Sequence, residues 1–144
     1  MNQSSIYPHF HVKVCKAHQF KSVELSVKEL DLDDRQMSPE QFMVVEEEGK
    51  LMGFVRLKKY RDFAELCTLG VLEQFRFKGI ATELVKTIKE TANCPLYLVS
   101  TLPDFFSKLG FVECENYPTE IHQKLAYCKA NLPVDEKYVV MRAR

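Results

Sequence analysis

Hydrophobic residues in this chain follow two spacings, one typical of β-strands and the other typical of helices. Short apolar or alternating runs fall over residues 9–14, 41–60, 63–71, 96–100 and 137–142. A turn at residues 48–50, which contains Gly49, divides the second run into a hairpin, so the pattern predicts six strands. Apolar residues three and four positions apart predict helices over residues 21–34 and 80–92.

The helix over residues 80–92 has the clearest pattern, and a shorter helix follows the next strand. Its apolar side consists of Ile80, Ala81, Leu84, Val85, Ile88 and Ala92. Thr101 is the expected cap of a short helix over residues 101–111, and Gly110 suits the left-handed position that ends it. Residues 117–133 fit either an irregular or a helical insert. Strands and helices alternate along the chain, which predicts an α/β fold.

Composition limits the number of domains and the kinds of partner. The 144 residues are 46% hydrophobic, enough for one core and a single domain over residues 1–144. The 20 basic and 20 acidic side chains cancel, so we expect neither nucleic acid nor an anionic membrane as a partner. No segment is apolar enough to span a membrane or to be the core of a signal peptide, which favours a cytoplasmic location.

Cysteine and histidine spacing gives no sign of a disulfide framework or a metal centre. The five cysteines form no CxxC pair, and the four histidines lack the spacing of metal ligands. We therefore expect reduced thiols and no bound metal.

Residues 73–85, EQFRFKGIATELV, run from a predicted strand into the start of the clearest helix. The first N–H groups of a helix have no partner inside the helix and carry about half a positive charge, so such a turn attracts phosphate. Gly79 permits close approach of the backbone, while Arg76 and Lys78 add positive charge. The pattern fits a pyrophosphate-binding turn, although an ordinary turn with two solvated cations has the same local features.

Two short motifs together resemble the GNAT family of N-acetyltransferases. The segment RFKGIA, residues 76–81, matches the family's [QR]-x-x-G-x-[GA] motif for acetyl-CoA, and FFSKLGF, residues 105–111, is similar to its second motif. The resemblance extends from about residue 42 to residue 114. It implies a central mixed, mostly antiparallel sheet of about six to seven strands with helices on both faces. The later segments are most similar to the amino-acid acetyltransferases, including N-acetylglutamate synthases.

The resemblance also implies which residues bind acetyl-CoA or coenzyme A. In the family, the strand equivalent to residues 65–71 separates from its neighbour, and its exposed backbone pairs with the pantetheine arm. The cofactor-binding positions that this implies lie in the strand, in the pyrophosphate turn and in the second motif. In that order they are Leu69, Gly70 and Val71; Arg76, Phe77, Lys78, Gly79, Ile80, Ala81 and Thr82; and Phe106 and Lys108. The Val71 N–H is expected to polarise the thioester carbonyl. Phe105 and Phe111 are expected to fill the core.

Glu65 is the candidate general base for removing a proton from the attacking amine. Strict alternation along its strand would place Glu65 on one face with Phe63, Leu69 and Val71, among apolar neighbours. Members of the family often use a glutamate in this strand, directly or through water. The alternative is a carboxylate that is solvated or paired with Arg56 or Lys58 on the adjacent strand.

Three positions depart from what many members of the family carry. Phe106 replaces a tyrosine that protonates the leaving thiolate, so Tyr127 or Tyr138 is a candidate to serve instead. Phe77 stands where glycine is common. Cys67 stands where members that use glutamate often carry arginine, which argues against glutamate as the acceptor.

These features predict an N-acetyltransferase in which the amine of a small molecule or amino acid attacks acetyl-CoA directly. Two alternatives are a non-catalytic acyl-CoA-binding or regulatory module, which Phe106 favours, and a protein N-acetyltransferase. The expected partner is a small-molecule amine or amino acid, and a homodimer is an open alternative for the assembly.

Overall fold

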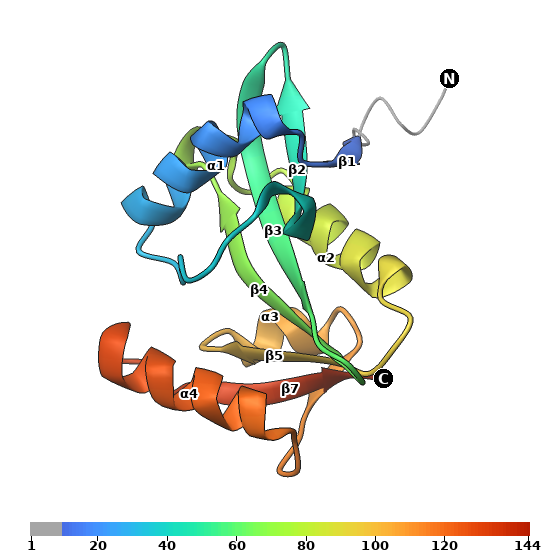
Figure 1. The fold of residues 1–144 in the computed structure, drawn as a ribbon, viewed down its shortest axis with the longest axis vertical. Coiled ribbons are helices and arrows are strands. Elements are labelled where there is room, and N and C mark those ends of the chain that lie inside the picture. Colours follow the sequence, from blue (N-terminus) through green and yellow to red (C-terminus); the bar gives the residue numbers. More distant parts are fainter. Residues whose placement is uncertain (1–9) are drawn as a thin grey trace.

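The computed structural model describes residues 10–144, and the chain is arranged around one seven-stranded sheet (Figure 1). The strand order is β1-β2-β3-β4-β5-β7-β6, and every neighbouring pair is antiparallel except β4 and β5. The strands are β1 Val12–Val14, β2 Phe42–Glu47, β3 Lys50–Lys59, β4 Ala64–Val71, β5 Leu96–Ser100, β6 Phe111–Glu113 and β7 Val139–Ala143. This confirms the expected mixed, mostly antiparallel sheet.

Four α-helices cover the two faces of the sheet, as expected. They are α1 Ala17–Glu29, α2 Ile80–Thr91, α3 Pro103–Ser107 and α4 Thr119–Asn131. Buried residues of α2 and α3 belong to one apolar cluster, whereas those of α1 and α4 belong to two others. Helices α2 and α3 therefore cover one face, and α1 and α4 cover the other.

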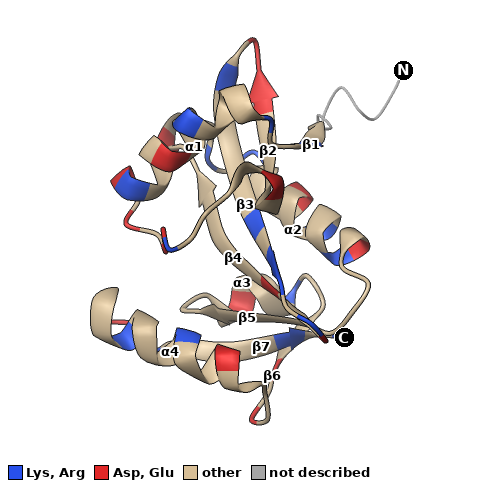
Figure 2. Cartoon of the chain, viewed as in Figure 1, with Lys and Arg blue, Asp and Glu red and all other residues tan. Residues whose placement is uncertain are grey.

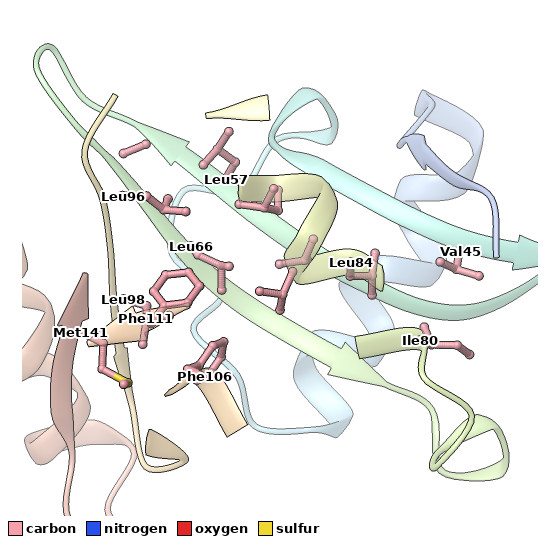
Figure 3. Packing of buried hydrophobic residues seen from close by; sticks show 14 of the residues in the cluster. Val45, Leu57, Leu66, Ile80, Leu84, Leu96, Leu98, Phe106, Phe111 and Met141 are labelled. Atoms are coloured by element: carbon pink, nitrogen blue, oxygen red, sulfur yellow. The ribbon is translucent and has the colours of Figure 1, made fainter. Parts of the chain in front are cut away.

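The largest apolar cluster lies between α2 and the sheet (Figure 3). Ile80, Leu84, Val85 and Ile88 are almost completely buried, in agreement with the predicted apolar side of this helix. A Cβ atom at Gly53 of β3 would lie only 2.8 Å from the Ile80 side chain. Glycine at this position therefore allows the start of α2 to lie directly against the sheet.

The predicted hairpin is confirmed and has a two-residue turn. Glu48 and Gly49 connect β2 to β3, and both have positive φ angles, 52° and 77°. A turn of this kind matches the right-handed twist of the two strands, and glycine adopts it without strain.

Strand β4 does not alternate strictly, which corrects the predicted environment of Glu65. Phe54 of β3 lies opposite Gly70, but Arg56 lies opposite Cys67, so β4 carries one extra residue in this interval. Thr68 has a φ angle of 48°, as expected for a bulge at this point. Because the extra residue changes the facing of the strand, Leu69 and Val71 pack on the α2 side, opposite to Glu65.

Several element boundaries differ from the predictions. Helix α1 begins and ends earlier than residues 21–34, because Leu30 caps it and Asp31 turns with a φ angle of 54°. Residues 117–133 contain helix α4, and β6 is a strand that the pattern did not predict. The strand expected over residues 9–14 is β1, three residues long, and His9 lies outside the described residues.

The predicted cap of the short helix is also wrong. Leu102, not Thr101, is the capping residue of α3, because Pro103 occupies the first helical position. The Ser100 hydroxyl oxygen accepts a hydrogen bond from the Leu102 N–H at 2.9 Å. Gly110 does have the predicted left-handed conformation, with a φ angle of 88°.

Charged residues of both signs are spread over the outer helices and the β2–β3 hairpin (Figure 2). Over residues 10–144, no helix combines the length and the apolar character needed to cross a membrane.

Candidate functional site

Strands β4 and β5 separate at the centre of the sheet. They pair in parallel only at Ala64 with Leu96 and at Glu65 with Tyr97, and the remainder of β4 pairs only with β3. The two strands diverge beyond this point in Figure 1. The separation expected for this strand is present, and two adjoining cavities lie along it.

The first cavity, which we name the α2 cavity, has a volume of about 580 Å³ and lies at the start of helix α2. It is lined by Leu30, Leu32, Leu69, Gly70, Val71, Phe75, Arg76, Phe77, Gly79, Ile80, Ala81, Thr82, Leu102 and Phe105. Nine of the predicted cofactor-binding residues line it, so residues from β4 and from the turn before α2 do come together. Lys78 and Lys108 are exposed and line neither cavity.

The turn before α2 presents unpaired backbone groups to this cavity. Gly79 is the N-cap residue with a φ angle of 89°, and no atom lies within 4 Å of the place where its Cβ would be. Gly79, Ile80, Ala81 and Thr82 all line this cavity, and the first N–H groups of a helix have no partner inside the helix, so this end of the cavity attracts an anion. Arg76 Nε donates a hydrogen bond to the Val71 carbonyl at 3.1 Å, which connects the turn to the end of β4.

Phe77 is the most unusual residue of this turn. It has a φ angle of 66°, which costs energy for any residue except glycine, and its side chain is fully exposed at 104%. An exposed ring on a strained backbone gains nothing from burial in the fold, and this ring is one of the side chains that line the α2 cavity.

The second cavity, which we name the α4 cavity, has a volume of about 690 Å³. The loop after α1, strands β4 and β5, and the end of α4 with the segment after it all contribute to its lining. Four leucines line both this cavity and the α2 cavity, namely Leu30, Leu32, Leu69 and Leu102. The two cavities are therefore neighbours, and they meet beside Leu69 of β4.

Three buried side chains, those of Asp33, Lys124 and Glu65, form what we name the buried charge cluster. Lys124 Nζ donates a hydrogen bond to Asp33 Oδ2 at 2.8 Å and lies 3.1 Å from Glu65 Oε2. The Arg35 guanidinium donates two hydrogen bonds to the Asp33 carboxylate, from Nε to Oδ1 and from Nη2 to Oδ2, each 2.9 Å long. Glu65 Oε2 accepts no hydrogen bond from the described residues, so the charge of Lys124 is what stabilises it.

The pKa of Asp33 is lowered in the fold, whereas the pKa values of Lys124 and of the neighbouring Cys67 are raised. Burial alone would raise the pKa of Asp33, but hydrogen bonds from Arg35 and the charge of Lys124 hold it well below its ordinary value. Burial alone would lower the pKa of Lys124, but Cys67, Glu65 and Asp33 together raise it. Burial, followed by the charge of Glu65, raises the pKa of Cys67 to about 11. At neutral pH, Asp33 and Lys124 are therefore ionised and Cys67 is a neutral thiol.

Glu65 lies behind the α4 cavity and does not line it. Its side chain is only 2% exposed, and its nearest polar neighbours are Lys124 and the Tyr60 hydroxyl, which is 3.5 Å from Oε1. Neither expected alternative partner forms an ion pair with Glu65. Arg56 donates instead to Gln41 and to the carbonyls of residues 35 and 36, and Lys58 Nζ lies over the Tyr60 ring, 5.6 Å from its centre. The residues of this cluster that line the α4 cavity are Asp33 and Lys124.

Comparison with known proteins agrees with this geometry. Residues 11–111 match the model of the acetyltransferase (GNAT) family, which is well over half of the chain. The chain belongs to the GNAT family. Membership confirms the resemblance found in the two motifs and assigns the chain to the acetyltransferases.

Individual GNAT relatives are more distant. The chain is 28% identical over 102 residues to an uncharacterized N-acetyltransferase of Chlorobaculum tepidum, a match that covers 66% of each protein. N-acetylglutamate synthase of Neisseria gonorrhoeae, solved with coenzyme A and N-acetyl-glutamate, superimposes with a TM-score of 0.75 at 17% identity. That match covers 94% of this chain but 35% of the synthase, so the chain spans about a third of its length.

A second solved structure is similar to this chain along almost the whole length of both proteins. Rv2747 from Mycobacterium tuberculosis, solved in complex with CoA, has a TM-score of 0.76 at 18% identity, covering 92% of this chain and 98% of Rv2747. At such low identity, the two solved structures support the fold alone. Both contain coenzyme A, the cofactor that the motifs imply.

The second GNAT motif contributes both core and cavity residues. Phe106 is 4% exposed, packs in the largest apolar cluster and also lines the α4 cavity. Phe111 is in the core, as expected, whereas Phe105 is half-buried and lines the α2 cavity. Of the two candidate tyrosines, Tyr138 lines the α4 cavity, and Tyr127 instead stacks on the Arg35 guanidinium at 3.4 Å.

Asp33 and Lys124 are the functional candidates that the sequence analysis missed. Lys124 shares one buried face of α4 with Ile121 and Cys128, at spacings of three and four residues. A lysine within an apolar helix face is a signal that a carboxylate partner is needed, but the sequence does not show which carboxylate it meets. Among residues 10–144, no group of three or more potential metal ligands occurs.

Proposed function

We propose that this GNAT-family chain transfers an acetyl group from acetyl-CoA to the amine of a small molecule or amino acid. The observation that carries this proposal is the pair of adjoining cavities along the separated edge of β4. One cavity lies at the N-terminus of α2 and suits a pyrophosphate group. The other lies beside the buried charge cluster and has room for an acceptor.

The residues of the α2 cavity fit coenzyme A. The N–H groups of residues 77–82 and the charge of Arg76 would hold the pyrophosphate, with Lys78 and Lys108 adding positive charge from outside the cavity. The backbone of Leu69, Gly70 and Val71 would pair with the pantetheine arm. Bound acetyl-CoA supplies an activated thioester for direct attack by the amine.

In this proposal, the acetyl group of acetyl-CoA lies where the two cavities meet. Leu69 lines both cavities, whereas Val71 lines only the α2 cavity. We therefore favour a backbone N–H near Leu69, rather than that of Val71, as the group that polarises the thioester carbonyl. Tyr138 lines the α4 cavity, where its hydroxyl donates a hydrogen bond to the Leu132 carbonyl, and we assign it the role of proton donor that Phe106 cannot fill once that bond is released.

Glu65 acts on the reaction indirectly in this proposal. It is buried behind Lys124, and together with Asp33 it fixes the position of the ammonium that reaches the α4 cavity. Glu65 is thus a positioning residue, and its effect should appear in the parameters of the acceptor rather than in the KM for acetyl-CoA.

The test is thiol release from acetyl-CoA with a panel of free amino acids, amines, polyamines and lysine peptides. Wild type is expected to turn over one class of small amines, and Glu65→Gln to lower kcat/KM for that acceptor by about tenfold or more while KM for acetyl-CoA stays the same. Binding of coenzyme A without turnover of any amine would instead favour a non-catalytic acyl-CoA-binding module. Turnover of peptides alone would favour a protein N-acetyltransferase.

A further inference from the structure

The α4 cavity has an apolar lining with very few charges. Strands β4 and β5 and the loops on either side contribute aliphatic side chains, including Leu30, Leu32, Leu66, Leu98, Leu132 and Val134. Such a surface favours an acceptor with an apolar body, because burying apolar groups of both partners removes them from water.

The ionised side chains that line this cavity have a negative balance. They are Asp31, Asp33 and Lys124, two carboxylates and one ammonium. The third carboxylate, Glu65, lies directly behind Lys124 at 3.1 Å. The Arg35 guanidinium is close by, but it is engaged by Asp33 and by the ring of Tyr127.

The one cation that lines the cavity is already neutralised. Lys124 Nζ is shared between Asp33 at 2.8 Å and Glu65 at 3.1 Å, so its charge is balanced by two carboxylates. An acceptor carboxylate would meet no free cation among the described lining residues, because Lys124 and Arg35 are paired with Asp33 and Glu65, and it would be repelled by the unpaired Asp31. An acceptor ammonium would instead be attracted, and Asp31, which is exposed and forms no ion pair with the described residues, is available to it.

We propose that the acceptor is a primary amine with an apolar body and no carboxylate beside its amino group, rather than a free amino acid. An alkylamine or arylalkylamine has this chemistry. The inference rests on the proposed acetyl transfer, and it narrows the class of acceptor. Asp31 is the residue that selects for the positive charge, while the Asp33–Lys124 pair denies a site to a carboxylate.

The experiment compares three compounds that differ only at one carbon: phenethylamine, phenylalanine and phenylalanine amide. Thiol release from acetyl-CoA gives kcat/KM for each, and calorimetry on protein saturated with coenzyme A gives their affinities without turnover. We expect phenethylamine to exceed phenylalanine by about tenfold or more in both measurements, because the carboxylate is repelled and unpaired. The amide, which lacks the negative charge, is expected to lie close to phenethylamine.

Two variants test the cause of the preference. Asp31→Lys supplies a free cation and is expected to lower the ratio of phenethylamine to phenylalanine several-fold. Asp34→Lys is the matched control, because Asp34 is exposed in the same loop but does not line the α4 cavity, and it should leave the ratio unchanged.

The outcomes separate this inference from the proposed function. Turnover or binding that favours phenylalanine over phenethylamine would overturn the inference while the acetyl transfer stands. A strong preference for the amide over phenethylamine would also overturn it, because it would indicate a peptide N-terminus as the acceptor. If no compound releases thiol but phenethylamine still binds more tightly than phenylalanine, the preference of the cavity for an apolar amine is supported, while the acetyl transfer, and with it the acceptor role, is overturned. Binding of none of the three would overturn the inference.

Discussion

At the scale of single residues, the buried ion pair between Glu65 and Lys124 is the feature with the largest energetic consequence. Glu65 is 2% exposed and Lys124 is 7% exposed, so neither charge is compensated by water. A buried charge that loses its partner costs several kcal/mol, even where the intact pair contributes little.

Removal of the Lys124 charge is therefore expected to destabilise the fold. Lys124→Met should lower the free energy of unfolding by about 3–5 kcal/mol, measured by urea denaturation. The double variant Lys124→Met with Glu65→Gln is the control, since it removes the uncompensated carboxylate as well, and it should recover part of the loss. Strictly additive losses in the two variants would contradict a direct interaction between these residues.

Phe77 is expected to lower stability while contributing to coenzyme A binding. Its φ angle of 66° is unfavourable for phenylalanine, and its exposed ring makes no stabilising contribution through burial. We expect Phe77→Gly to raise the free energy of unfolding by roughly 0.5–1 kcal/mol, because glycine adopts this conformation freely. The same change should weaken coenzyme A binding, because the ring lines the α2 cavity.

Phe77→Ala separates these two effects. It removes the ring but keeps a Cβ atom in the strained conformation, so coenzyme A affinity should fall without a gain in stability. A gain equal to that of Phe77→Gly would show that the strain is not located at this residue.

At the scale of elements, the start of helix α2 is the part of the site that depends least on side chains. Gly79→Glu places a negative charge at the N–H groups that would hold the pyrophosphate, and affinity for coenzyme A should fall by at least about tenfold in calorimetry. The substitution also introduces a side chain at a φ angle of 89°, which by itself costs about 1 kcal/mol of stability.

Gly49→Glu is the matched control for this backbone cost. Gly49 also has a positive φ angle, 77°, and also has no atom within 4 Å of its missing Cβ, but it lies in the β2–β3 turn. Both variants should lose similar stability, and only Gly79→Glu should lose coenzyme A affinity. Unchanged affinity in Gly79→Glu would rule out the turn as the pyrophosphate site.

At the scale of the whole molecule, the buried charge cluster joins three parts of the sheet and its covering layers. Asp33 lies after α1, Glu65 in β4 and Lys124 in α4, so ionisation of one member affects the packing of all three. The stability of the fold should therefore depend on pH at both ends of the scale.

The direction of this dependence follows from the pKa shifts. The pKa of Asp33 in the fold lies well below its ordinary value of 3.8, so the unfolded chain takes up a proton first and stability falls as the pH drops below about 4. The pKa of Cys67 rises from 9.0 to about 11 in the fold, and that of Lys124 rises above 10.5, so stability also falls as the pH increases beyond about 9. Melting temperatures from pH 2 to 11 should show a plateau between these limits.

Asp33→Asn provides the control for the acid side of this profile. The variant should be less stable than wild type on the plateau, and the difference should shrink as the pH falls toward 2, because the wild-type carboxylate is then protonated. A difference that stays constant with pH would mean that Asp33 contributes through packing and not through its charge.

The sequence by itself determined helix α2 and the β2–β3 turn, and it predicted the residues of the proposed cofactor end of the site. Helix α2, the β2–β3 turn and the residues of the pyrophosphate turn depend on local spacing and on glycine, which neighbouring residues in the chain suffice to specify. Only the tertiary structure decided which residues meet at the proposed acceptor end. The extra residue at Thr68 changes which side chains of β4 face each other, and Lys124 meets Glu65 across 59 positions of sequence and Asp33 across 91 positions. Charges so far apart in the chain become partners only when α4 packs on the sheet, so no periodicity in the sequence could identify them.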